Sequence, residues 1–207
     1  MAIRKYEDLN SIQLDVLKEI GNIGSGNAAT ALASLLNRTV DMAVPEVCLV
    51  DFQQAIEIMG DPEKLIVGIL IRMNEDIEGM IMFLLEEPFA KTIVNGLIGE
   101  HPFSLYELDG SDISVLNEIG NIMGGSYVNA IADIAGMTID ISVPALTVDM
   151  LGAIMSVPAV ELSQVGDKVL LINEQFLIDS VEIHSNMLLI PTVDSLEKLL
   201  KTLGVDQ

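Results

Sequence analysis

Hydrophobic positions recur with a helical period through two stretches of the chain. In the first stretch, apolar or small residues return every three or four positions from Leu17 to Leu35, which is the spacing of one buried helix face. Four polar or small residues share the opposite face: Asp15, Glu19, Asn22 and Gly26. The pattern predicts a long helix over residues 11–37 that exposes a carboxylate and an amide side by side.

The second stretch repeats the first 99 positions later. Twelve of the 27 positions from Glu19 to Pro45 are identical to those from Glu118 to Pro144, which is typical of an internal repeat. Asn121 takes the place of Asn22, so the Glu-x-x-Asn pair is present twice. A polar face kept by duplication alone is the simpler interpretation of this pair. A shared chemical function of the two pairs is the alternative.

Shorter patterns predict the remaining elements of each half. The expected elements of the first half are a strand over residues 39–50 interrupted at Pro45, a short helix over 52–59 capped by Asp51, a hairpin of strands over 65–73 and 79–85, and a helix over 88–98. The corresponding elements of the second half are a helix over 112–135, a strand over 138–148, a short helix from Asp149 to Val157, strands over 168–178 and 182–190, and a helix over 192–203.

This order predicts an α+β fold built from a tandem, pseudo-twofold repeat of an α-β-α-β-β-α unit. Residues 1–104 form the first half and residues 105–207 the second, and together they make one compact domain. We expect two three-stranded sheets joined edge to edge, with the two long helices paired on one face.

Composition narrows the classes of partner and compartment. A net charge of −21 with only ten Lys and Arg residues argues against nucleic acid and anionic membranes as partners. Apolar runs such as Leu65–Ile71 are far shorter than the roughly 20 residues of a membrane span. A single cysteine, Cys48, and an amino-terminal segment without an apolar core predict a cytoplasmic protein without disulfides. Cys48 is expected to be a buried strand residue.

Other candidate chemistry is weak. The glycine-rich segment from Gly21 to Gly26 lies within a helical pattern, whereas phosphate-binding loops follow a strand. His101 and His184 lack neighbours at zinc or hydrolase spacing and are expected in a linker and a strand. Asp15 and Glu19 offer two carboxylates on an exposed turn, which is a poor cation site. We therefore expect no metal or cofactor on this chain.

The Glu-x-x-Asn pair has one plausible chemistry. A carboxylate can bind a cationic group of a partner, and an amide, which both donates and accepts hydrogen bonds, can hold a water molecule. Because an amide is not a base near neutral pH, the electrophile must be labile enough for positioning to suffice. An acyl phosphate on an aspartate meets that requirement.

The spacing of these residues resembles a known family. The pattern Asp/Ser-x3-Glu-x2-Asn-x22-Pro is complete twice, at Asp15, Glu19, Asn22 and Pro45 and again at Ser114, Glu118, Asn121 and Pro144. The chain resembles the CheC family of chemotaxis phosphatases, relatives of CheX and FliY. The resemblance covers nearly the whole chain, including the segment ELSQVG at residues 161–166.

This resemblance implies an activity and a site. The family hydrolyses the aspartyl phosphate of the response regulator CheY, with Glu19 and Glu118 pairing with a lysine of the regulator. Asn22 and Asn121 would orient the attacking water, and the Mg²⁺ would belong to the regulator. A non-catalytic adaptor that binds phosphorylated CheY or the receptor deamidase CheD is the alternative function.

The resemblance also implies a second partner. Many CheC proteins bind CheD, and we expect the uncharged segment from Asp149 to Val157 to contribute to that contact. Duplication within one chain lowers the need for a dimer, so we expect a monomer.

Overall fold

The computed structural model describes residues 5–162 and 168–205. Its elements are η1 (Tyr6–Asp8), α1 (Ser11–Leu36), β1 (Val40–Met42), β2 (Glu46–Asp51), α2 (Phe52–Met59), β3 (Leu65–Glu75), β4 (Gly79–Leu85), α3 (Glu87–Ile98), α4 (Gly110–Ala135), β5 (Ile139–Ile141), β6 (Ala145–Met150), α5 (Leu151–Leu162), β7 (Lys168–Ile178), β8 (Val181–Pro191) and α6 (Val193–Thr202). Helices and strands appear in the same order in each half, and the predicted α+β class is confirmed.

The strands form one antiparallel sheet, in the order β1-β7-β8-β4-β3-β5. The β3–β4 and β7–β8 hairpins meet at the centre through β4 and β8. β2 continues the edge of β1 along β7, and β6 continues that of β5 along β3. The outer strands of each half therefore pair with the hairpin of the other half.

This exchange corrects the prediction of one three-stranded sheet per half. Pairing of β2 with β7 joins Cys48 to Leu171, and pairing of β6 with β3 joins Val148 to Val67. The alternation of apolar residues in β2 and β6 is compatible with pairing to either hairpin. The crossing is fixed by where the long helices carry the chain, so the pattern within the strands could not reveal it.

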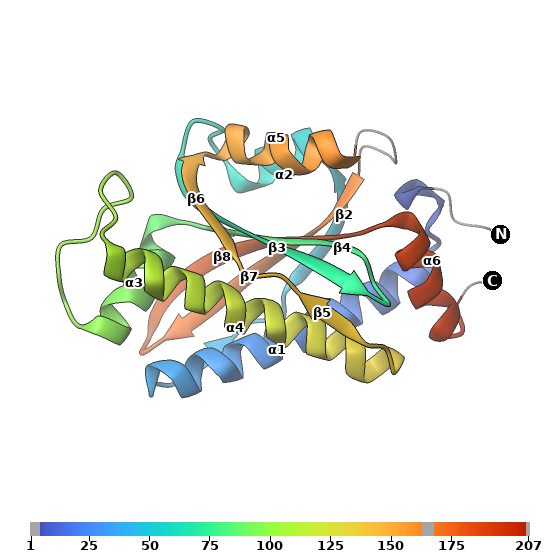
Figure 1. Cartoon of the computed structure of the whole chain (residues 1–207), viewed down its shortest axis with the longest axis horizontal. Helices are drawn as coiled ribbons and strands as arrows, with labels where there is room; N and C mark the ends of the chain where they lie inside the picture. The colour runs from blue at the N-terminus through green and yellow to red at the C-terminus, as the bar shows by residue number, and fades with distance from the viewer. Residues whose placement is uncertain (1–4, 163–167, 206–207) are drawn as a thin grey trace.

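Helices cover both faces of the sheet (Figure 1). α1 and α4 lie side by side in opposite directions under one face, and α2 and α5 lie against the other face. Alternate residues of β4 serve the two sides: Phe83 belongs to the core beneath the long helices, and Met82 to the core beneath α2 and α5. The predicted pairing of the long helices on one face is confirmed, and both pack closely on the sheet.

Glycines permit this close approach of the long helices. A Cβ added to Gly120 of α4 would clash with Ile69, and one added to Gly24 of α1 would clash with the ring of Tyr127. The helical propensity lost at these positions, about 1 kcal/mol each, is thus offset by contacts that a side chain would prevent.

Within the described residues, no helix combines the length and apolar character that crossing a bilayer requires.

The second short helix differs from its prediction at both ends. Asp149 and Met150 belong to β6, where they pair with Ile66 and Leu65, so α5 begins later than expected. It also continues through Pro158, a residue that usually ends a helix. Pro158 is buried, as is Ile154 on the same helix, and this packing holds the helical path beyond the predicted end.

Candidate functional site

The two sequence motifs lie on the outward faces of α1 and α4. Asp15, Glu19, Ser114, Glu118 and Asn121 are exposed, and Asn22 is half-buried. The buried faces of both helices point to the sheet, where Leu17 and Leu116 are almost fully covered. Helical periodicity therefore placed the polar stripe correctly.

The central pair of each motif has no partner inside the described part of the chain. No group within residues 5–162 and 168–205 forms a hydrogen bond or ion pair with the side chains of Glu19, Asn22, Glu118 or Asn121. These carboxylates and amides keep their full hydrogen-bonding capacity for another molecule.

The first residue of each motif makes a local contact. The Lys18 ammonium lies 3.3 Å from the Asp15 carboxylate in an exposed ion pair, which is worth less than about 1 kcal/mol. The Ser114 hydroxyl donates to the carbonyl of Gly110 at 2.7 Å. In the second motif Ser114 and Asn117 take the places of Asp15 and Lys18, so the second site lacks both members of this ion pair.

A groove runs beside the second motif. One wall is α4, and the other is the segment between β5 and β6; the lining residues are Ser114, Asn117, Glu118 and Asn121, with Ile141, Ser142, Val143 and Pro144 opposite. The ring of Pro144 lies near the bare backbone of Gly120. The motif proline thus packs on the helix one residue before Asn121, and the groove opens over the Glu-x-x-Asn pair.

Capping interactions fix the starts of both helices. Asn10 and Gln13 form a capping box at α1, and Asp109 and Asp112 form one at α4. Such boxes satisfy amide groups that lack helical partners. The first turn of each helix is therefore fixed, and this helps to fix the direction in which the exposed stripe faces.

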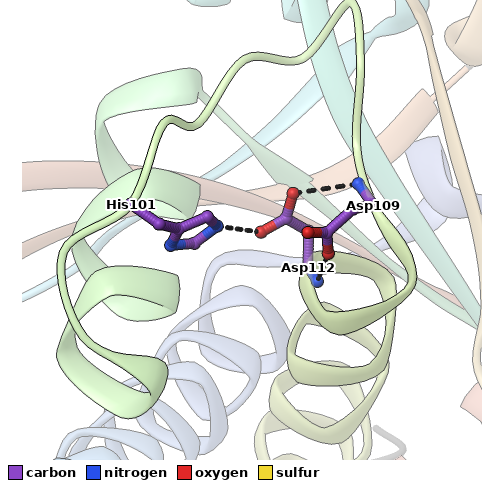
Figure 2. A group of neighbouring side chains, drawn as sticks. All are labelled: His101, Asp109 and Asp112. Carbon is purple, nitrogen blue, oxygen red and sulfur yellow. Dashed lines mark hydrogen bonds and ion pairs between the residues drawn. The ribbon is translucent and has the colours of Figure 1, made fainter.

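His101 adds a second anchor to α4. Figure 2 shows its imidazole pointing at the buried carboxylate of Asp112, with Nε2 2.7 Å from Oδ1. Nδ1 lies 3.3 Å from the carbonyl oxygen of Gly99. The hydrogen bond to Asp112, followed by the one to Gly99, raises the pKa of His101 above its ordinary value. His101 lies in the linker between α3 and α4, as predicted, and its hydrogen bonds to Gly99 and Asp112 join the two helices.

The same residues form the one cluster within the described ranges that could supply three cation ligands. Donor atoms of His101, Asp109 and Asp112 lie within 4.8 Å of one another. However, Asp109 accepts from the backbone N–H groups of Ser111 and Asp112, and the second oxygen of Asp112 accepts from the N–H of Asp109. Helix capping accounts for this cluster. The Asp-x-x-Asp spacing before α4 could have revealed the box from sequence.

A buried polar group lies between the long helices and the sheet. The Ser25 and Tyr127 hydroxyls are hydrogen-bonded, Tyr127 donates to Glu174 at 2.5 Å, and Ser185 donates to the other oxygen of Glu174 at 2.6 Å. Burial raises the pKa of Glu174, and these hydrogen bonds oppose the rise. We call Ser25, Tyr127, Glu174 and Ser185 the polar quartet. It joins α1, α4, β7 and β8 but lies away from the exposed motifs.

Two other predicted residues, Cys48 and His184, lie on strands of the sheet. Cys48 lies on β2 as expected but is half-buried and not buried, and burial, followed by the nearby Glu46, raises the pKa of its thiol. His184 is an exposed strand residue beside Glu182, as predicted. Residues 163–166 of the ELSQVG segment lie outside the described residues.

Known proteins are similar to this chain in sequence. A sequence model of the CheC-like family matches residues 12–49 and 113–148, which are the two motif regions. The chain is 36% identical over 203 residues to a Bacillus subtilis (strain 168) protein named CheY-P phosphatase CheC, covering 96% of this chain and 97% of the relative. It is 30% identical over 143 residues to the flagellar motor switch phosphatase FliY of the same strain, covering 69% of this chain and 37% of that protein.

A solved structure supports the same assignment at the level of the fold. The crystal structure of Thermotoga maritima FliY superposes with a TM-score of 0.73 at 24% identity, covering 96% of this chain and 99% of the other. Near-complete coverage of a relative at 36% identity, with both motif regions matched, shows that this chain belongs to the CheC-like family.

Proposed function

We propose that this protein is a phosphatase that hydrolyses the aspartyl phosphate of the response regulator CheY at two sites. The observation that supports it most directly is the duplicated pair of exposed, unpartnered side chains, Glu19 with Asn22 and Glu118 with Asn121. The name of the Bacillus subtilis relative, a CheY-P phosphatase, supplies the substrate.

The glutamates would dock the regulator. An exposed carboxylate with no internal partner can pair with a lysine ammonium of the phosphorylated protein, and such a charge-assisted contact fixes orientation. The net charge of −21 favours approach of a positively charged surface. Docking brings the acyl phosphate over the helix turn between each glutamate and its asparagine.

The asparagines would orient water for attack on phosphorus. The amide oxygen accepts a hydrogen bond from a water molecule, whose oxygen forms a bond to phosphorus as the bond from phosphorus to the aspartate oxygen breaks. The electron pair of the broken bond leaves with the carboxylate, and the water proton passes to solvent or a phosphate oxygen. Positioning is enough because phosphoryl transfer needs little other help from the protein.

The decisive test is the lifetime of phosphorylated CheY with and without this protein. We expect a shorter lifetime with the wild type, partial loss of that effect with Asn22→Ala or Asn121→Ala, and near-complete loss with the double variant. Each positioned amide is expected to lower the barrier by about 2 to 4 kcal/mol. Asn27→Ala and Asn129→Ala, which change exposed asparagines elsewhere on the same helices, are matched controls.

Full activity of the double variant would contradict the mechanism. The adaptor alternative predicts a different result, in which the wild type binds phosphorylated CheY but leaves its lifetime unchanged. Measuring binding and lifetime on the same samples separates the two functions.

We also propose that the outer face of α5 contributes to binding of CheD. On α5, Val157 is 43% exposed and Val160 72%, and Met150, the last residue of β6, is 49% exposed, so apolar side chains border the solvent along this segment. Residues 151–160 contain no charged side chain, and Glu161, near the end of the helix, is paired with Arg72 by two hydrogen bonds. Ile154, also in the predicted contact segment, is buried and belongs to the core.

The equivalent helix of the first half provides a control for this contact. Val157 corresponds to Ile58 of α2, which is 50% exposed. We expect Val157→Lys to weaken CheD binding in a calorimetric titration, while Ile58→Lys leaves it unchanged. Equal affinities for the two variants would exclude α5 as the contact.

A further inference from the structure

Two valines beside the motifs are unusually exposed. Val143 is 86% exposed and Val44 is 84% exposed, the highest values among the large apolar side chains of the described residues. They occupy equivalent positions of the repeat, each immediately before the motif proline. Single exposed apolar residues are common on protein surfaces, but two at the same point of both copies require a local explanation.

The backbone holds both valines in defined positions. A proline after each valine restricts that valine to extended conformations. The preceding residues are tied to the sheet, since Ala43 N–H donates to Gln175 at 3.0 Å and Ser142 N–H donates to Arg72 at 2.9 Å. The loops therefore present the valines with little conformational entropy left to lose on binding.

The groove places Val143 opposite the catalytic pair proposed above. Val143 and Pro144 line one wall, and Glu118 and Asn121 line the other. A molecule that reaches the amide of Asn121 with a reacting phosphate must also cover this loop. At the first motif, α1 packs against β1 and β2 as α4 does against β5 and β6, and Val44 takes the equivalent position in the repeat.

We infer that Val143 and Val44 are contact residues for the phosphorylated response regulator, which covers them with an apolar part of its surface around the phosphorylated aspartate. This inference rests on the proposed function and adds a binding determinant to it. The valines carry no group that can act on water or phosphate. Their contribution is equal in the ground and transition states, so it lowers KM without changing kcat.

The test is steady-state hydrolysis of phosphorylated regulator by the full chain carrying Val44→Ser and Val143→Ser together. Both loops are exposed, so folding should be retained, as circular dichroism can verify. We expect KM to rise about tenfold, because covering a valine stabilises a complex to roughly that extent or more, and kcat to stay constant. Val181→Ser changes a valine that is 54% exposed at the start of β8 and should alter neither constant. Val143→Leu in the Val44→Ser background should recover affinity at the second site.

Several outcomes would overturn the inference. An unchanged KM would show that the regulator does not cover the valines, and a lower kcat at constant KM would show that they act on the reaction itself. A wild type that is dimeric in sedimentation and becomes monomeric on the double substitution would identify a second copy of this chain as the occupant. Failure of the proposed function is recognised separately, because the wild type would then leave the phosphate lifetime unchanged.

Discussion

The two motif helices have matching outer faces and different inner faces. α1 and α4 are each 26 residues long and expose the same Glu-x-x-Asn pair. Ser25 of α1 is hydrogen-bonded within the polar quartet, to which α4 contributes Tyr127, whereas the α4 counterpart of Ser25 is Gly124, which lies over the side chain of Ile71. The two helices therefore pack on the sheet through different buried residues, while their exposed motif residues are the same. A polar face left over from duplication would have been free to change as the inner faces did.

The starts of the two helices differ as well. α1 is closed by Asn10 and Gln13, and the Gln13 amide also donates to the carbonyl of Val205 at 2.9 Å. α4 is closed by two aspartates and held by His101. A titratable anchor is therefore present at the helix of the second site and not among the described contacts at the start of the first. Three substitutions test these differences.

The largest effect is expected at the contact between α1 and Tyr127. The three atoms nearest to a Cβ at Gly24 all belong to the ring of Tyr127, whereas a Cβ at Gly26 meets nothing within 4 Å. Gly24→Ala should lower the free energy of unfolding by about 3 kcal/mol through overpacking. Gly26→Ala should raise it by roughly 0.5 to 1 kcal/mol through helix propensity. Urea denaturation of both variants measures the two changes, and equal signs would contradict the close contact.

A smaller effect is expected from the polar quartet. Tyr127→Phe removes the hydroxyl that donates to Glu174 and contacts Ser25, and it leaves buried polar atoms with fewer partners. We expect a loss of about 1 to 2 kcal/mol in the free energy of unfolding. Tyr106→Phe, at a side chain that is 82% exposed, should change nothing measurable. If the two variants are equally stable, the quartet does not distinguish the inner faces of the helices.

The smallest effect is expected at the anchor of α4 and depends on pH. The folded protein raises the pKa of His101. The protonated imidazole therefore stabilises the folded state fully below the unfolded pKa of about 6.5. This stabilisation is lost as pH rises through the higher folded value. The difference in melting temperature between wild type and His101→Gln should therefore shrink as the pH is raised above about 6.5.

His184→Gln serves as the control for loss of an imidazole, because His184 and its partner Glu182 are both more than half exposed. It should show no such trend. A pH-independent difference for His101→Gln would mean that the hydrogen bond to Asp112, and not the charge, anchors the helix.

Local signals in the sequence were sufficient for most elements and for the orientation of the site. The 3.6-residue period placed Glu19 and Glu118 in solvent, and Asp51 was correctly predicted to cap α2. These features depend on neighbours within one or two helical turns. The repeat strengthened these predictions, because the same pattern occurs in both halves of the chain.

What the sequence did not reveal depends on contacts between distant segments. His101 meets Asp112 only because the linker folds back over the start of α4, and Glu174 is tolerated in the core only because Tyr127 and Ser185 reach it from other elements. Val143 borders the groove because Pro144 packs on Gly120. The roles of the motif residues in catalysis stay predictions until the variants are measured.

The exchange of outer strands also determines when the fold can be completed during synthesis. β2 is paired with β7, a strand that leaves the ribosome more than a hundred residues later. The first half therefore emerges with both edges of the β3–β4 hairpin still open, and such non-local pairings slow folding. Until the last hairpin is made, the nascent chain carries an unpaired strand edge that chaperones or neighbouring chains could engage.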